Sequence, residues 1–511
     1  MVKKLRILLT VLGAVILIMA LGYMTTSWLE DIVRSKVKGV PALQIDSLDI
    51  DLLDRRIRAF RVEFRKNGHD LMIDELVIRG IAIIPLIMEK NHLVIDGMAI
   101  KGMTLIHRQS YQSGTDGAAS ELPSIELGEI RISESEVSVF NQTDSLQFWS
   151  KVEAGLEGVT DRDIGSADSI ISRLKYLTLD SLIFISEDRL YSTSVEEIVG
   201  TNDEVRVRGL KSTSNYGKYT LGHQVGHEID WIDASIDSMV VRSKPHLHLS
   251  CIQKIDVYNP VFNAFRDKRL PFPNDNRPPL VRDVLGNQNQ TFSVDSISIH
   301  DGKIVYEELV NHEKGPGFVS FEQLDATVTS FASYHLKKGI RPRLIASCQL
   351  YGKVQLYADI SFPTSPQMKH TLVKGKLAAT DLSILNNMTS YVSELEIKSG
   401  RSENMEFEFS HTQTHATGEM KFVYNDLSIS FLEAPGSEGN EVVNDIKAFF
   451  VNTFVIDKNN DLDGTKFRLG KIDQDRDIRK SMFNFWWIAI LDGLKSSTGV
   501  DTSGQKVVVN Q

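Results

Sequence analysis

The sequence of 511 residues is poor in cysteine and has no excess of basic charge. Its two cysteines, Cys251 and Cys348, are too few for a disulfide framework. Whether they pair, or lie apart as two buried thiols, stays open at this point. The net charge is −10 at pH 7, and lysine and arginine form no block with interleaved aromatic residues. We therefore expect no nucleic-acid partner.

Catalytic and metal-binding signatures are missing as well. The sequence has no Gly-x-Ser-x-Gly elbow, phosphate-binding loop or dinucleotide fingerprint. His223 with His227, and a second pair at His246 and His248, have no cysteine or carboxylate at ligand spacing beside them. Residues 459–464 resemble only the start of a calcium loop, because the twelfth position is Gly470. We expect no catalytic residue, no metal and no cofactor, and predict that the protein is not an enzyme.

One long uncharged run does occur, at residues 7–28, between a short basic stub and two acidic residues. About 20 apolar residues in a helix span the ~30 Å hydrocarbon core of a bilayer. The run predicts a transmembrane anchor, with a juxtamembrane helix up to residue 40. A cleaved secretory signal is the alternative, because 20–22 fit a small-x-small cleavage site. The basic stub favours an internal N-terminus and export of the rest of the chain.

The remainder of the chain is dominated by alternation of apolar and polar residues with a period of two. Clean examples lie at 48–52, 354–360 and 405–409. A further series, 420–424, continues after a predicted turn at Asn425 and Asp426 into 427–431. This pattern predicts antiparallel strands joined by short turns, each with one apolar face. Similar apolar-x-apolar units recur at 93–106, 124–140, 174–185 and 292–306, which favours an elongated, repetitive β-stack curled into an open groove.

Breaks in the pattern divide the chain. We predict an N-terminal β-groove module at 41–257, a proline-rich connection at 258–290, a C-terminal β module at 291–433 and a helical region at 434–511 with a polar tail. Helices are expected at 444–456 and 476–496. The second is amphipathic, with Ile478, Met482, Trp486 and Ile490 in one stripe and Asp475 and Asp477 as N-terminal caps. It is too short to cross a bilayer, so it either covers the end of the β-stack or docks on a membrane surface or a partner.

The bulky residues of the C-terminal strands give the candidate functional surface. Because side chains alternate along a strand, they should share one concave face, while Glu406, Glu408 and Lys421 face water. An uncovered apolar face of this size normally marks a binding surface, and acyl chains could fill it. The candidate groove residues are Val354, Leu356, Ile360, Met405, Phe407, Phe409, Met420, Phe422, Tyr424, Leu427, Ile429 and Phe431.

The assembled features resemble the AsmA-like family of bacterial envelope proteins, relatives of the TamB-type assembly proteins. The resemblance covers nearly the whole chain and rests on the N-terminal anchor, the β entry at 43–54, the unit at 292–306 and the terminal blocks at 376–387, 395–401, 416–430 and 476–487. It carries no active-site residues. It implies an inner-membrane anchor, a β-groove in the periplasm and a part in outer-membrane homeostasis or in phospholipid movement between membranes.

Two functions are therefore expected. The first is a groove that holds phospholipid or another ligand with acyl chains, in a single-pass protein of the inner membrane. The second is a structural or assembly factor for envelope proteins, whose concave face pairs with a polypeptide strand. Bound lipid favours the first, and crosslinked polypeptide favours the second.

Overall fold

The computed structural model describes residues 42–499, apart from 52–53, 67, 83–91, 109–123, 164–166, 244–250, 274–276, 287–291, 312–313, 334–340, 364–369, 394, 433–455 and 463–466. The chain is 66% strand, in one mixed sheet of 21 strands with few helices. The predicted mainly-β class is confirmed. The predicted span at 7–28 and the predicted helix at 444–456 lie outside the described residues. Within the described ranges, no helix has the length and apolarity needed to cross a membrane.

The chain divides into two compact units. Unit 1 comprises residues 1–211 and 242–249, and unit 2 comprises 212–241 and 250–511. The proline-rich stretch at 258–290, where we expected a connection between modules, falls inside unit 2. It contains a strand, β12 (Val261–Asp267), that pairs with strands on both sides. The expectation that no internal strand forms there is wrong, because Pro260 and Pro271 flank a proline-free segment.

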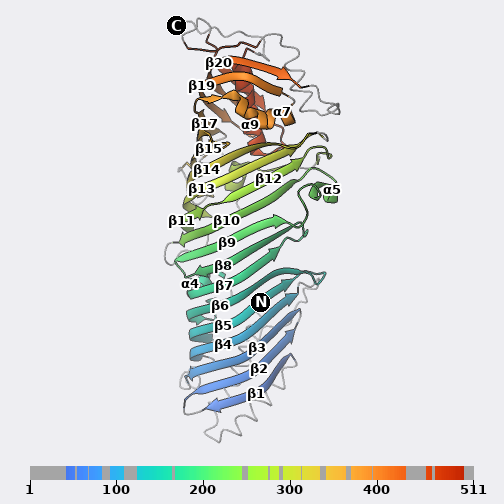
Figure 1. Cartoon of the computed structure of the whole chain (residues 1–511). Coiled ribbons are helices and arrows are strands. Elements are labelled where there is room, and N and C mark those ends of the chain that lie inside the picture. Colours follow the sequence, from blue (N-terminus) through green and yellow to red (C-terminus); the bar gives the residue numbers. More distant parts are fainter. Residues whose placement is uncertain are drawn as a thin grey trace. The chain divides into compact units, whose positions relative to one another are not determined.

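Unit 1 is built on consecutive strands, coloured blue to green in Figure 1. Neighbours from β1 to β8 are paired, antiparallel in every case except β4 with β5. A short helix, α4 (Ala167–Ser172), precedes β7. The strands are β1 (Leu43–Asp51), β2 (Arg56–Lys66), β3 (His69–Ile81), β4 (His92–Arg108), β5 (Ser124–Phe140), β6 (Leu146–Thr160), β7 (Leu174–Ile185), β8 (Tyr191–Gly200) and β9 (Glu204–Ser214), the last of which runs into unit 2.

Unit 2 continues with β10 (Asp230–Ser243), β11 (Cys251–Tyr258), β12, β13 (Ser293–Leu309), β14 (Gly317–Ala332), β15 (Arg343–Leu350), β16 (Val354–Ser361), β17 (Thr371–Leu377), β18 (Thr380–Asp381), β19 (Leu395–His411), β20 (His415–Phe431) and β21 (Gly470–Asp475). Its helices are α5 (Leu221–Val225), α6 (Val281–Gly286), the 3₁₀ helix η2 (Leu382–Leu385), α7 (Asn386–Val392) and α9 (Met482–Ser497). Antiparallel pairs join β13 through β17, then β19, β20 and β21.

The sheet is mixed, so the prediction of a purely antiparallel meander is wrong. Strand β4 pairs in parallel with β5, and β13 pairs in parallel with β11 along its first half and with β12 along its second. A parallel pair needs a returning connection of a dozen or more residues, and the chain supplies one after Arg108 and another after Asp267. Local alternation in the sequence is the same for both kinds of pair.

The predicted turn at Asn425 and Asp426 is also wrong, because β20 runs through it as one strand. Asp426 has φ of +55°, and the pairing with β19 shifts register beside it. An extra residue in this left-handed conformation is a β-bulge, which bends a strand without ending it. Its effect is to turn Leu427 back to the face already occupied by Tyr424, so both side chains are buried.

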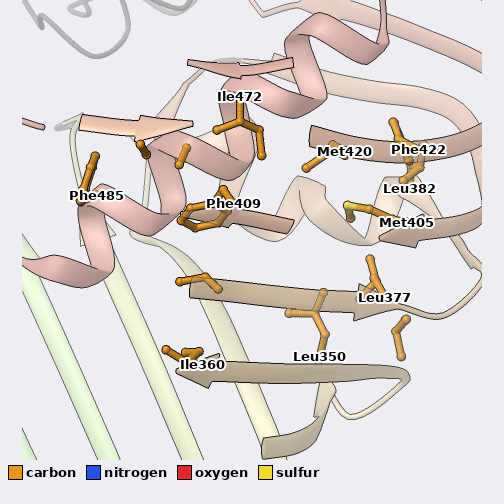
Figure 2. Packing of buried hydrophobic residues seen from close by; sticks show 14 of the residues in the cluster. Leu350, Ile360, Leu377, Leu382, Met405, Phe409, Met420, Phe422, Ile472 and Phe485 are labelled. Atoms are coloured by element: carbon orange, nitrogen blue, oxygen red, sulfur yellow. The ribbon is translucent and has the colours of Figure 1, made fainter. Parts of the chain in front are cut away.

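Each unit has its own apolar core. In unit 1 it gathers residues of β1 to β6, among them Val62, Ile78 and Ile95. In unit 2 it lies between β15–β21, η2 and α9, and Figure 2 shows Phe409, Met420 and Ile472 beside Phe485 of the helix. The unit 2 core is therefore closed by a helix as well as by strands.

Candidate functional site

The strands of unit 1 form a groove-like sheet with one continuous apolar face. Residues that are partners across neighbouring strands lie on the same face of a sheet. We define the inner face of unit 1 by the apolar partners of β4 to β8, which are Met98–Ile130–Leu156, Ile100–Ile132–Ala154–Leu177, Leu105–Val137, Val152–Leu179–Ile198 and Phe148–Phe184.

Strict alternation does not hold along these strands, because two rows of bulges cross the sheet. In the first row Gly80 has φ of +68° and Gly158 has φ of +63°, and in the second Arg61 has φ of +48° and Gly102 has φ of +63°. At each bulge the inner face is continued by a residue three positions on, as from Ile100 to Met103. Bulges bend strands and increase their twist. Two aligned rows therefore curve the sheet of unit 1.

Glycine is required where a side chain would collide in the first row. A Cβ on Gly80 would lie 1.9 Å from Oδ2 of Asp96, and one on Gly128 would lie 2.5 Å from the carbonyl oxygen of Asp96. Neither substitution fits without movement of the backbone, since Gly80 also has a positive φ. The bend at this row is thus written into the sequence as glycine.

The inner face is covered unevenly. Ile95, Leu127 and Val159, at one end of the strands, are buried in the unit 1 core. Further along the same strands, Leu105, Val137 and Leu179 are only partly buried. At the far end Phe184 is 48% exposed, although its backbone partner, Phe148, is also apolar. Among the described helices of unit 1, α4 contributes only Ile170, and it packs on the buried end. The rest of the inner face is accessible.

The candidate groove residues of the C-terminal strands do share one face. Phe407 is the partner of Met420, Met405 is the partner of Phe422, and the alternates Glu408 and Glu419 are exposed. That face is buried rather than open, since Phe409 and Met420 are 1% and 0% exposed and belong to the unit 2 core. Their role in contacting a lipid stays a prediction. The side chain of Phe431 lies outside the described residues.

Helix α9 is what covers this face. It begins at Met482, not at 476, and its N-cap is Ser481, whose Oγ accepts a hydrogen bond from the amide of Asn484. The predicted capping by Asp475 and Asp477 is wrong, because Asp475 ends β21 and Asp477 binds the guanidinium of Arg479. The buried positions of the helix are Phe485, Ala489, Gly493 and Ser497, one residue away from the predicted stripe.

In unit 2 a second accessible apolar face lies on β10, β12 and β13. Phe262 is the partner of both Ala234 and Ile304, and Ala264 is the partner of both Ile232 and Tyr306. We call these six residues the inner face of unit 2. Phe262 is 40% exposed and Ile304 is partly buried. Two residues further along each strand, the same face becomes charged.

This charged row consists of Glu228, Asp230, Arg266, Lys268 and Glu308. Arg266 binds Asp230 with two parallel hydrogen bonds, from Nε at 2.7 Å and from Nη2 at 2.6 Å. Lys268 Nζ lies 2.8 Å from Oε1 of Glu308, and the hydroxyl of Tyr306 donates to Oε2 of Glu308 at 2.8 Å. Glu308 is nearly inaccessible to solvent. Buried charges of this kind are stable only when they are paired and hydrogen-bonded.

Electrostatics in the charged row reflect both burial and pairing. Burial raises the pKa of Glu228, and the neighbouring charges of Lys268 and Arg266 only partly oppose it. Burial alone would lower the pKa of Arg266, but its hydrogen bonds with Asp230 outweigh that effect and the pKa lies above its ordinary value. Burial, together with Glu308, raises the pKa of Tyr306 well above its ordinary value. Tyr306 is therefore a neutral hydrogen-bond donor at physiological pH.

The sequence analysis missed the charged row, although a signal was present. In 262–266 and in 304–308 the in-phase positions run from apolar, through alanine or tyrosine, to charged. A charge at the inward phase of an apolar alternation marks either a strand end or a polar border of the apolar face. Strand pairing brings these charges together from segments more than thirty residues apart, as the bond from Arg266 to Asp230 shows.

The residues considered for metals and for a disulfide do not form a site. His223 is exposed with its Nε2 3.9 Å from Asp267, His227 contacts the carbonyl of Glu228, and the other histidine pair lies outside the described residues. No group of three metal-ligating side chains occurs in the described part of the chain. Cys251 and Cys348 are both free, and burial raises the pKa of the Cys348 thiol to about 11.

Comparison with known proteins adds no assignment to this geometry. No family model matches the sequence, and no curated protein is significantly similar to it. The functional argument therefore rests on the two inner faces and on the charged row that borders one of them.

Proposed function

We propose that the inner faces bind the acyl chains of phospholipids, and that the protein is a membrane-anchored periplasmic component that moves phospholipid between membranes or maintains the outer membrane. The observation that carries this proposal is the accessible apolar face of unit 1, from Leu105 on β4 to Phe184 on β7. Bulky apolar residues repeat on it strand after strand. The AsmA-like resemblance of the sequence supports the same function.

Physical considerations favour an acyl chain as the occupant. Soluble proteins seldom expose a contiguous apolar surface beyond a few hundred Å² unless it binds something. Strands β4 to β8 cover four strand spacings, which is about 19 Å. Each methylene group removed from water contributes about 0.8 kcal/mol. A chain lying across these strands would gain several kcal/mol without any specific hydrogen bond.

The protein offers a matched pair of residues for the test. Phe184 and Ile183 are neighbours on β7, are 48% and 37% exposed, and lie on opposite faces of the sheet. Because both are exposed, a glutamate at either position should leave folding intact. A carboxylate among acyl chains costs several kcal/mol unless it is neutralised. Phe184→Glu should therefore reduce bound lipid, and Ile183→Glu should not.

The measurement is phospholipid that co-purifies with the full-length chain, quantified by mass spectrometry per mole of protein. We expect lipid on the unaltered protein and on Ile183→Glu, and a loss of about threefold or more on Phe184→Glu. Protein without lipid, or equal lipid on both variants, would refute the proposal. Circular dichroism of both variants verifies that the strand content is kept.

A photo-crosslinking residue at position 184 separates lipid from polypeptide. Recovery of lipid adducts supports the groove. Recovery of a polypeptide instead would favour the alternative, an assembly factor for envelope proteins. A crosslinker at 183 on the opposite face serves as the matched control.

A further inference from the structure

The charged row of unit 2 borders an apolar face in the order in which an amphiphile is built. Along β12 the inward positions are Phe262, Ala264 and Arg266, and along β13 they are Ile304, Tyr306 and Glu308. Successive inward positions are about 6.6 Å apart, so the change from aromatic to ionic takes roughly 13 Å. A lipid with its acyl chains on Phe262 and Ile304 would place its headgroup at this row.

The row holds an unbalanced carboxylate. Asp230 is bound by Arg266, and Glu308 is bound by Lys268 and Tyr306. Among the described residues, no hydrogen bond or ion pair reaches the carboxylate of Glu228, although Lys268 and Arg266 are close enough to act on it electrostatically. Three carboxylates therefore face two cations. A desolvated carboxylate in such a place is stabilised by a further cation.

The same row can also hold an anion beside that cation. Arg266 has five N–H donors and directs two of them to Asp230, and Lys268 has three donors on one ammonium group. Both side chains keep part of their surface accessible. A phosphate next to an ammonium group would meet these donors, while the ammonium would meet Glu228.

We propose that the charged row is a headgroup site for a zwitterionic phospholipid with a primary ammonium group, bound through Glu228 and, at its phosphate, through Arg266 and Lys268. This inference rests on the proposed function, since it assumes that the apolar inner face of unit 2 holds the acyl chains. It adds the class of lipid that the groove selects. An anionic phospholipid without an amine would leave Glu228 unsatisfied and would be disfavoured.

The test uses the full-length protein in detergent, mixed with micelles containing equal amounts of phosphatidylethanolamine and phosphatidylglycerol. Bound lipid is extracted and both species are quantified. Glu228→Gln keeps the shape of the side chain and removes its charge, and it should lower the ratio of bound phosphatidylethanolamine to phosphatidylglycerol at least about threefold. Asp233→Asn is the control, because Asp233 lies on the same strand with the opposite phase to Asp230.

The outcomes separate this inference from the proposed function. An unchanged ratio in Glu228→Gln, with lipid still bound, overturns the headgroup site and leaves the groove intact. Absence of either lipid from the unaltered protein overturns both. A second measurement needs no variant: a carbodiimide joins a carboxylate to an adjacent primary amine as an amide. The peptide containing Glu228 should gain the mass of phosphatidylethanolamine, and labelling only of other carboxylates would refute the site.

Discussion

The inner face of unit 1 and the core around α9 in unit 2 are made of the same kind of strand but end in opposite states. Phe184 on the first is 48% exposed, whereas Phe409 in the second is 1% exposed. Both belong to apolar series with in-phase partners on the neighbouring strands. The pattern within the strands therefore specifies which face is apolar, and a separate element decides whether that face is a core or a surface.

In unit 2 that element is α9, and its small residues explain how closely it docks. Ala489 and Gly493 are buried against the sheet, and Ser497 Oγ donates to the carbonyl of Gly493 at 2.8 Å. A Cβ on Gly493 would lie 2.9 Å from Cγ1 of Ile472 and 3.0 Å from Cε of Met420. The only described helix of unit 1, α4, has six residues. It is too short to cover the inner face of its unit.

The largest expected difference between the two regions is in stability. Phe409→Ala removes a fully buried ring and should lower the free energy of unfolding of unit 2 by about 3–5 kcal/mol. Phe184→Ala removes a half-exposed ring and should cost below about 1 kcal/mol. Guanidinium titration with hydrogen exchange on β19 and β7 measures each region. Equal costs for the two variants would show that the inner face of unit 1 is packed in solution, and would break the comparison.

A smaller effect is expected from separating α9 from its strands. Gly493→Val places two methyl groups where even a Cβ is crowded, and overpacking of this kind costs about 1–3 kcal/mol. Hydrogen exchange should accelerate in α9 and β21 and stay unchanged in β4 to β8. Lys495→Val, on the same helix at a position that is not buried, is the control. If the two variants exchange alike, the close approach at Gly493 does not hold the helix.

Much of the local structure could be predicted because it depends on neighbours in sequence. The alternation at 354–360 placed Val354 and Ile360 on the buried face and Gln355 and Tyr357 outside. The bulges could not be predicted in full. Gly80 and Gly102 are permissive for a positive φ, but Arg61, Glu134 and Ser181 adopt it without any compositional signal. Parallel pairing of β4 with β5 was equally hidden, since it depends on how a distant strand returns.

The candidate site was predicted in kind but not in place. The shared face of Met405, Phe407 and Phe409 was correct, yet the sequence could not show that α9 packs against it, because the contact joins Phe485 to strands more than seventy residues away. The accessible faces lie on other strands. Phe148 and Phe184, or Phe262 and Ile304, are unremarkable alone and become a surface only through strand pairing.

The contact between α9 and its strands should also depend on pH, through His411. Its Nε2 accepts a hydrogen bond from Nε1 of Trp486 at 2.9 Å, so the ring proton resides on Nδ1, which lies 2.7 Å from the carbonyl oxygen of Thr412. Burial lowers the pKa of His411, and the positive charge of Arg476 acts in the same direction. Protonation of Nε2 would turn the acceptor into a second donor facing the indole N–H. The neutral ring therefore favours the docked helix.

The smallest of the three effects follows from that histidine. A histidine whose pKa is depressed in the folded state binds protons more readily when unfolded, where its pKa is about 6.5. Its contribution is fully present above that pH and is lost as the pH falls toward the folded pKa. Unfolding of unit 2, followed by the fluorescence of Trp486 and by hydrogen exchange in α9, should become easier between pH 7 and pH 5, while exchange in β4 to β8 changes less. His411→Gln can still accept from the indole and donate to Thr412 without titrating, so it should flatten the pH response of α9. A response as steep as that of the unaltered protein would show that other groups hold the helix, and that closure of this face does not depend on a neutral His411.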